Sequence, residues 1–316
     1  MHDPTPPADP SRRRLLHQAG TGLMLASAAT LLPLQPAYAV APAPSGAASL
    51  ARTRSGRVAG QRENGVHVFR GIRYGADTAP TRFQPPRLPE PWRGVRDALA
   101  YGASAPQGGG EGPGSEDCLF LNVWTPGLRD GARRPVLVYI HGGAFSTGSG
   151  SDPLYDGAAL CRLGDVVVVT LNHRLNLLGY LYLARHGLAR PGGDALADPG
   201  LADSGNAGQL DLVQALQWVQ AHAGEFGGDP GNVTVFGQSG GGAKIATLMA
   251  MPAARGLFHR AWTMSGQQVT AAGPRAASQR AALVLEHFNA DAQALRTLPL
   301  PRLLEALKIR DPSRVE

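Results

Sequence analysis

Ser239 is the residue of this sequence that is best placed to act as a nucleophile. It is the central residue of 237–241 (GQSGG), which fits the G-x-S-x-G pattern of a nucleophile elbow. The β-prone residues 233–236 precede this pattern and the helix-forming residues 243–251 follow it, which predicts a strand, a sharp turn and a helix. Glycine would let strand and helix close on each other, and the helix N-terminus would point free N–H groups at developing negative charge. The alternative is an ordinary serine in a glycine-rich turn.

Residues 141–145 (HGGAF) form a second motif with a chemical use. They directly follow an apolar run at 136–140, which places them at the carboxyl end of a predicted strand, where α/β sheets hold ligands. Small residues there let backbone N–H groups approach a substrate oxygen. Together with the N–H of Gly240, this loop is predicted to form an oxyanion hole. A plain glycine turn is the alternative.

The elements around these motifs indicate an α/β protein with a mostly parallel central sheet flanked by helices. Continuous apolar runs that helices separate are typical of a parallel sheet covered on both faces. Such runs are found at 136–140, 166–171, 233–236 and 261–264, and a helix is predicted at 210–222. Before them come a linker at about 40–50, two short antiparallel strands at 56–59 and 66–69, irregular chain at 77–94, a flexible loop at 108–114 and a strand at 119–124.

Composition excludes several classes of function. The chain has 316 residues, 43% of them hydrophobic, which is enough for a large core. The net charge is +6, but no basic run interleaves with aromatic residues, so no nucleic-acid partner is expected. The nine histidines and two cysteines show neither H-x-x-x-H nor C-x-x-C spacing, so no metal and no cofactor is predicted.

The N-terminus has the pattern of an export signal. Residues 11–16 (SRRRLL) resemble a twin-arginine motif, and an apolar run at 19–34 leads to 37–39 (AYA), a cleavage site before Val40. The run is too short and too polar for a stable membrane span. We therefore expect a signal peptide at 1–39 and a secreted or periplasmic protein at 40–316, with a disordered tail as the alternative. Cys118 and Cys161 need not pair, because twin-arginine substrates fold before export.

Several segments together resemble a known family. In the order and spacing of four segments, the chain is similar to the type-B carboxylesterase/lipase family, relatives of the cholinesterases. The segments are residues 116–126 (EDCLFLNVWTP), then HGGAF, then 226–230 (FGGDP), which runs into GQSGG. The resemblance extends from about residue 57 to residue 266. It implies an α/β-hydrolase fold and hydrolysis of small-molecule carboxylic esters through an acyl intermediate on Ser239. It also implies that the N–H groups of Gly143, Ala144 and Gly240 bind the oxyanion.

The same resemblance implies two structural ion pairs, Arg82 with Glu116 and Arg174 with Asp211. Buried charges persist only when they are paired, so these residues are expected to hold the fold rather than to react. The alternative for all four is a solvated surface charge.

Three departures from the family pattern stand out. Gln238 replaces the commoner Glu before the serine, and the cysteine expected before Cys118 is missing, which predicts that Cys118 is a free thiol. The third departure concerns the rest of the triad, because in α/β-hydrolases an acid and a histidine follow the serine. Only residues 240–316 follow Ser239, and in this family both partners lie further downstream.

The internal histidines do not replace the missing one in the sequence. His222, His259 and His287 are each expected to be surface or helix-end residues. The chain is therefore interpreted as the N-terminal portion of an esterase whose C-terminal part is missing, with a separate C-terminal half as its expected partner. The alternative is a catalytically silent remnant or a cholinesterase-like binding or adhesion module.

Overall fold

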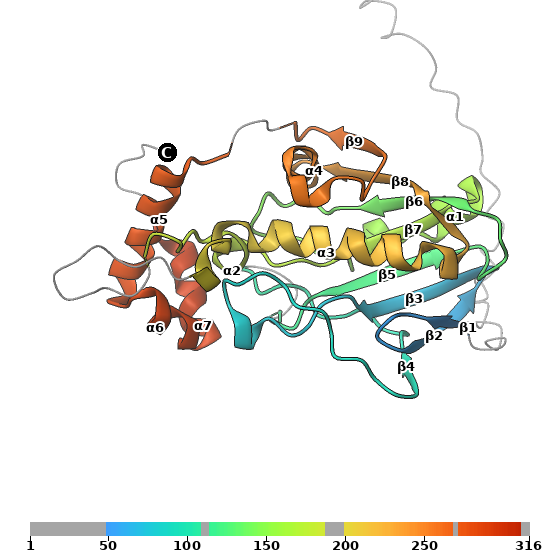
Figure 1. Ribbon diagram of the computed structural model, residues 1–316, viewed down its shortest axis with the longest axis horizontal. Helices are drawn as coiled ribbons and strands as arrows, with labels where there is room; N and C mark the ends of the chain where they lie inside the picture. The colour runs from blue at the N-terminus through green and yellow to red at the C-terminus, as the bar shows by residue number, and fades with distance from the viewer. Residues whose placement is uncertain (1–48, 109–113, 187–198, 268–270, 311–316) are drawn as a thin grey trace, which may run out of the picture. The chain divides into compact units, whose positions relative to one another are not determined.

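The computed structural model describes residues 49–108, 114–186, 199–267 and 271–310, and Figure 1 shows how their elements are arranged. The predicted signal peptide at 1–39, its cleavage site and most of the predicted loop at 108–114 lie outside the described residues. Within the described ranges, no helix has both the length and the apolar composition that crossing a membrane requires.

The described strands form one mixed, nine-stranded sheet. They are β1 (Ser49–Arg52), β2 (Arg57–Glu63), β3 (Val66–Arg73), β4 (Val95–Asp97), β5 (Phe120–Thr125), β6 (Arg134–Tyr139), β7 (Val167–Leu171), β8 (Gly228–Gln238) and β9 (Arg260–Met264). The order is β1-β2-β3-β5-β7-β6-β8-β9, with β4 paired to β2. Neighbours from β1 to β7 are antiparallel, and β7, β6, β8 and β9 run parallel. The parallel arrangement predicted from the sequence thus holds for the half that carries Ser239.

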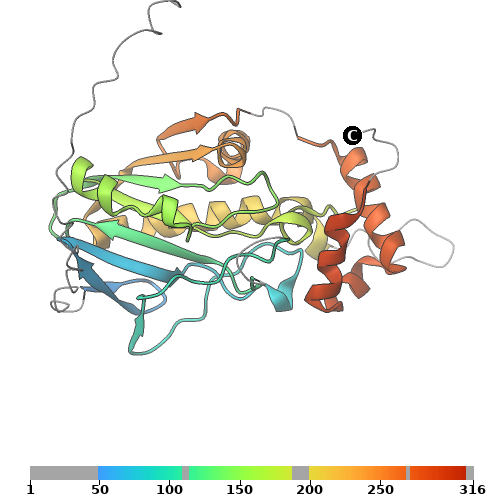
Figure 2. The same cartoon turned by 180° about the vertical axis from the view of Figure 1, so that it is seen from behind.

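Helices cover both faces of the sheet, as the apolar strands predict. All five residues of β7 are buried, because α3 (Ala207–His222) covers one face and α1 (Ala158–Gly164) the other. Views from front and back show these two helices on opposite sides (Figures 1 and 2). The helix predicted at 210–222 is therefore confirmed, and it begins three residues earlier.

The C-terminal helices form a second apolar cluster around α2 (Asn176–Tyr180). They are α5 (Pro274–Phe288), α6 (Ala292–Thr297) and α7 (Leu300–Leu304), drawn in red in Figure 1. Their buried residues, among them Val284, Leu295 and Leu303, pack with Leu178 of α2 and with Phe83. This cluster lies apart from the main core between α3 and the sheet.

Two strands were not predicted from the sequence: β1 overlaps the end of the linker expected at about 40–50, and β4 directly follows the irregular chain expected at 77–94. β1 occupies the end of the predicted linker because Ala51 is buried against the sheet, and β4 adds to β2 in parallel. The chain turns at Gly227, whose φ is +70°, and β8 begins at the next residue, where Gly228 pairs with Arg134.

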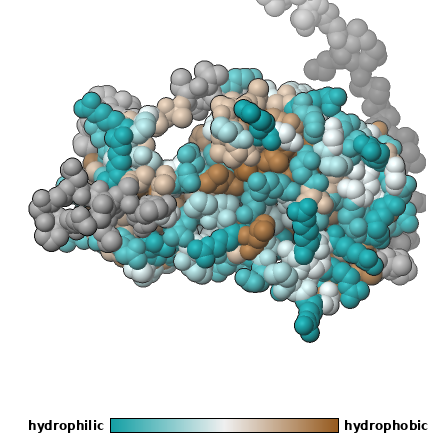
Figure 3. Space-filling model, in the orientation of Figure 1, coloured by the Kyte–Doolittle hydropathy of each residue, from teal (hydrophilic) through white to brown (hydrophobic). Residues whose placement is uncertain are grey.

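The last described strand has an exposed side. Among the described strands, β9 pairs only with β8, and Trp262 on β9 is 63% exposed. On the neighbouring α4 (Gly240–Ala250), Met249 is 65% exposed. Figure 3 shows apolar side chains, drawn in brown, gathering on this face near α4.

Candidate active site

Ser239 lies at a strained turn between β8 and α4. Its φ is 53° and its ψ is −122°, in the left-handed half of backbone space that non-glycine residues rarely adopt. The turn is held by the Ser239 N–H, which donates to the carbonyl of Met264 at 2.7 Å. A Cβ at Gly237 would lie 2.5 Å from the Ile140 carbonyl oxygen, and one at Gly241 would collide with the same atom. Glycine is therefore what allows β8, α4 and the end of β6 to meet.

The loop at 141–145 lies directly against this turn. A Cβ at Gly240 would lie 2.5 Å from the backbone nitrogen of Ala144, so the two segments touch backbone to backbone. Gly143 and Ala144 have φ values of 78° and 51°, and the carbonyl of Gly143 accepts the N–H groups of Ser146 and Thr147 at 3.1 and 3.0 Å. These two hydrogen bonds hold the loop in a tight turn directly after Gly143.

The N–H groups of Gly143, Ala144 and Gly240 donate to no other residue in the described part of the chain. Ser239 and Gly240 line a cavity of about 370 Å³ together with Ala144, Phe145, Ala243 and residues 265–267. Gly143 and Ala144 are exposed and Ser239 is half-buried, so a substrate carbonyl has access to all of them. A nucleophile beside unpaired N–H groups at a helix N-terminus is the arrangement that acyl transfer requires.

No histidine in the described ranges is placed to take the proton of Ser239, whose Oγ forms no hydrogen bond with a described residue. His259 accepts the N–H of Val233 at 3.2 Å, beside the middle of β8 and about 20 Å along the strand from Ser239. His222 uses both ring nitrogens, accepting the N–H of Arg54 and donating to the carbonyl of Trp218. His287 is exposed in the last turn of α5. The structure therefore agrees with the prediction that these three histidines are surface or helix-end residues.

Two other serines do contact histidines, but neither contact resembles a catalytic pair. His186 Nε2 lies 2.8 Å from Ser278 Oγ and 2.9 Å from the Ser278 carbonyl oxygen. Because a carbonyl only accepts, Nε2 carries the proton and cannot remove one from the serine. His67 Nδ1 lies 2.7 Å from Ser49 Oγ, but Ser49 is 2% exposed in β1 and out of reach of a substrate.

A buried group that the sequence analysis missed lies beneath the loop at 141–145. His141 and His173 stack with ring centroids 4.7 Å apart, and Lys244 Nζ donates to the His141 carbonyl at 3.2 Å. Burial, with the charge of Lys244, lowers the pKa of His141 to about 3 and lowers that of His173 as well, so both rings are neutral. Burial also lowers the pKa of Lys244 to about 7. The sequence signal was a lone lysine within an apolar helix.

The residues proposed as ion pairs lie in contact and are buried. Arg174 Nε and Nη2 donate to the two carboxylate oxygens of Asp211 at 2.9 and 2.6 Å, and Asp211 is fully buried. Arg82 Nε donates to Glu116 at 2.7 Å, and Arg82 Nη1 also donates to the carbonyl of Arg296 at 3.2 Å. The four charges therefore join segments of the fold and do not reach the cavity at Ser239.

The two cysteines and Gln238 were also singled out in the sequence. Cys118 and Cys161 are both buried and free, and burial raises the pKa of each thiol, which keeps both protonated. Gln238 is exposed. An additional pair that the sequence did not reveal joins Arg73 and Asp117 at 2.6 Å. In the described ranges no three His, Cys, Asp or Glu side chains gather in a way that could hold a metal ion.

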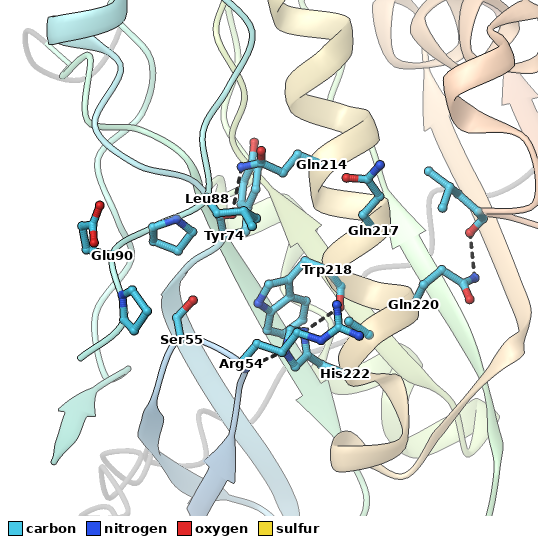
Figure 4. A pocket seen from close by; sticks show the side chains of 14 residues that line it. Arg54, Ser55, Tyr74, Leu88, Glu90, Gln214, Gln217, Trp218, Gln220 and His222 are labelled. Carbon is cyan, nitrogen blue, oxygen red and sulfur yellow. Dashed lines mark hydrogen bonds between the residues drawn. The ribbon is translucent and has the colours of Figure 1, made fainter. Parts of the chain in front are cut away.

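A larger cavity of about 720 Å³ lies away from Ser239, between α3 and residues 88–91 (Figure 4). Two of its polar side chains are engaged within the protein: Gln214 donates to the carbonyl of Tyr74 at 3.0 Å, and His222 accepts the backbone N–H of Arg54. Ser55 and His222 both line it, but both ring nitrogens of His222 are already bonded, to the Arg54 N–H and to the Trp218 carbonyl, so His222 has no free nitrogen to act as a base. The cavity at Ser239 is therefore the better candidate for chemistry, although it is smaller.

Comparison with known proteins agrees with this geometry. The model of the carboxylesterase family matches residues 47–308. The para-nitrobenzyl esterase of Bacillus subtilis is 44% identical over 265 residues, which are 80% of this chain and 51% of that protein. The phenmedipham hydrolase of Pseudarthrobacter oxydans is 41% identical over 271 residues, 81% of this chain and 51% of that protein. The chain thus spans about half the length of the curated relatives it matches.

Solved structures give the same answer for the fold. A carboxylesterase from Geobacillus stearothermophilus superimposes with a TM-score of 0.75 at 41% identity, covering 81% of this chain and 52% of that one. A para-nitrobenzyl esterase structure gives a TM-score of 0.72 at 42% identity, with 82% and 53% covered. These neighbours confirm the predicted α/β-hydrolase fold. The chain belongs to the carboxylesterase family.

Proposed function

We propose that this chain supplies the nucleophile and the oxyanion hole of a carboxylic-ester hydrolase. The observation that carries the proposal is the backbone contact between the Ser239 turn and the Ala144 loop, at the wall of an open cavity. It brings a strained serine next to N–H groups that have no partner among the described residues. The family relationship supports ester hydrolysis as the reaction.

In this reaction Ser239 Oγ attacks the ester carbonyl carbon, and the carbonyl electron pair moves onto oxygen. The N–H groups of Gly143, Ala144 and Gly240 donate to that oxyanion, and each such donor is worth about 3 kcal/mol of transition-state stabilisation. Collapse expels the alcohol and leaves an acyl-serine, which water then hydrolyses. The serine proton goes to a base outside the described residues.

Without that base, residues 40–316 alone are expected to be nearly inactive. Loss of triad function costs about 10⁶ in kcat, and the oxyanion hole leaves only weak residual catalysis. The acid and the histidine are proposed to come from a part of the protein outside the described residues. The unpaired side of β9 supports this proposal, because an edge strand presents N–H and C=O groups for a further strand. Export across the cytoplasmic membrane is proposed from the motif at 11–16.

Covalent labelling tests the assignment of the nucleophile. The natural polypeptide is incubated with a fluorophosphonate, and the adduct is mapped by mass spectrometry. We expect an adduct on Ser239, none in the Ser239→Ala variant, and normal labelling in Ser265→Ala, a matched control from the same cavity. Labelling at another serine would refute the assignment. A natural polypeptide in which no serine is labelled would favour the alternative, a silent binding module.

Turnover tests the role of the base. Residues 40–316 are assayed alone with p-nitrophenyl acetate, in parallel with their Ser239→Ala variant. We expect the same low rate for both. Esterase turnover that disappears only in the Ser239→Ala variant would show that a base is present within this segment after all.

A further inference from the structure

Lys244 is a fully buried lysine on α4 whose ammonium contacts both ends of the loop at 141–145. Its Nζ donates to the carbonyl of His141 at 3.2 Å. It also lies over the ring of Phe145, 5.6 Å from the ring centroid, within the range of a cation–π interaction. No carboxylate in the described ranges forms an ion pair with it. Among the described residues, the groups that stabilise its charge therefore belong to the loop.

A lysine in such a place destabilises the fold. An ammonium taken out of water loses hydration that one carbonyl and one aromatic face do not fully replace. Burial accordingly lowers the pKa of Lys244 to about 7. An apolar side chain of similar length would fill the same space at a lower cost. A destabilising charged residue next to a candidate active site therefore points to a use in that site.

The hydrogen bond from Lys244 to His141 is the one that joins the loop to α4 in the described part of the chain. The two segments carry different donors of the candidate oxyanion hole, because Gly143 and Ala144 lie on the loop and Gly240 begins α4. Their backbone contact sets only a closest approach, whereas a hydrogen bond also sets a direction. The bond from Lys244 is thus placed to fix how the two sets of N–H groups face each other.

The two ends of the loop differ in what else holds them. The Phe145 carbonyl accepts the N–H of Asn176 at 2.7 Å, and the Phe145 ring packs edge-on against Tyr180 with centroids 4.9 Å apart. The His141 carbonyl has Lys244 as its one donor among the described residues. A change at Lys244 is therefore expected to loosen the loop at its His141 end, directly before the donors.

We propose that Lys244 is a positioning residue for ester hydrolysis, which holds the loop at 141–145 against α4 so that the N–H groups of both segments converge on one oxyanion. The role rests on the proposed function. Lys244 acts through the His141 carbonyl and does not touch the substrate. Because the oxyanion forms only after Ser239 attacks, a displaced donor should slow turnover without weakening substrate binding.

Kinetics of the natural polypeptide test this role. Lys244→Met removes the donor and the charge while it keeps the length of the side chain. We expect kcat for p-nitrophenyl acetate to fall by about 10- to 100-fold, less than the loss of a whole oxyanion donor, and KM to change by less than about twofold. Lys244→Gln keeps a neutral donor on a side chain one bond shorter, and it should recover part of the lost kcat.

Lys308→Met is the matched control, because Lys308 is exposed, and it should keep the kinetics of the wild type. An unchanged kcat in Lys244→Met, or a loss that appears only in KM, would overturn the proposal.

Hydrogen exchange measures the order of the loop without turnover. The N–H groups of Ser146 and Thr147 bond to the Gly143 carbonyl, so they exchange only when this turn opens. In Lys244→Met both should exchange about tenfold faster, which is the factor that corresponds to one hydrogen bond. Slow exchange within β8 would show that the variant is folded. Equal exchange at Ser146 and Thr147 in wild type and variant would contradict the proposed role.

The outcome for Lys244 is separable from the outcome for the enzyme. Turnover that depends on Ser239 but is unchanged in Lys244→Met refutes the positioning role alone. A natural polypeptide without such turnover, in which Lys244→Met still speeds exchange in the loop, refutes the hydrolase and establishes that Lys244 orders the loop.

Discussion

Replacing Lys244 by methionine should stabilise the chain at neutral pH and remove a pH dependence of its free energy of unfolding. Lys244 is fully buried, and the one hydrogen bond that its side chain makes within the described part of the chain, to the His141 carbonyl, is 3.2 Å long. No carboxylate pairs with it in the described part of the chain. Methionine has a similar length and no charge, so it removes the cost of burying the ammonium while filling the same space.

The magnitude follows from the lowered pKa of Lys244. Burial lowers it from 10.5 to about 7, so between these values the unfolded chain holds a proton that the folded chain has released. The free energy of unfolding then rises by about 1.4 kcal/mol for each pH unit in this interval. The penalty is fully present below pH 7, and it vanishes as the pH approaches 10.5. Its size at neutral pH is therefore roughly 4 kcal/mol.

Urea unfolding followed by tryptophan fluorescence measures this difference. It is carried out at pH 7 and pH 9, at a protein concentration where the chain is monomeric. The wild-type chain should gain about 2 kcal/mol over this interval relative to Lys244→Met, because Lys244 is already half-deprotonated in the folded chain at pH 7. Lys308→Met is the control, because Lys308 is exposed, and it should follow the wild type. Contributions of the buried thiols and tyrosines cancel in the comparison.

The result that would refute this reasoning is a pair of parallel stability curves. If wild type and Lys244→Met changed equally between pH 7 and pH 9, Lys244 would hold the same charge in both states. The buried ammonium would then be solvated or paired in a way that the structure does not contain.

Three further outcomes are expected. Asp211→Asn should lower the free energy of unfolding, measured in urea, by about 3–5 kcal/mol, because it leaves the Arg174 guanidinium buried without its counter-charge. A decrease of less than 1 kcal/mol would contradict that account. Replacing both arginines at 12–13 by lysine should trap the precursor in the cytoplasm, and the exported protein should begin at Val40; normal secretion of the double variant would exclude the twin-arginine route. Residues 40–316 alone should self-associate through the exposed edge of β9, as measured by size-exclusion chromatography. Trp262→Lys should shift them toward monomer, because a charge blocks pairing at a strand edge. An unchanged elution profile of this variant would place the contact elsewhere.

Most of the fold could be predicted from the sequence, because its signals are local. The strands from β5 to β9 contain short apolar runs, and a strand buried on both faces, such as β7, needs only such a run to be recognised. The turn at Ser239 was predictable for the same reason, since its glycines lie within two residues of the serine. β1 and β4 were missed because short strands depend on partners far away in the chain rather than on their own composition.

The sequence by itself determined which residues could form a nucleophile turn and an oxyanion loop. Only the tertiary structure decided that Gly240 and Ala144 touch and that no described histidine reaches Ser239. It alone revealed the lysine beneath the loop and its contacts with both ends of the loop. The physical reason is that backbone preference acts over a few neighbouring residues, whereas burial and hydrogen-bond partnership depend on segments brought together only by folding.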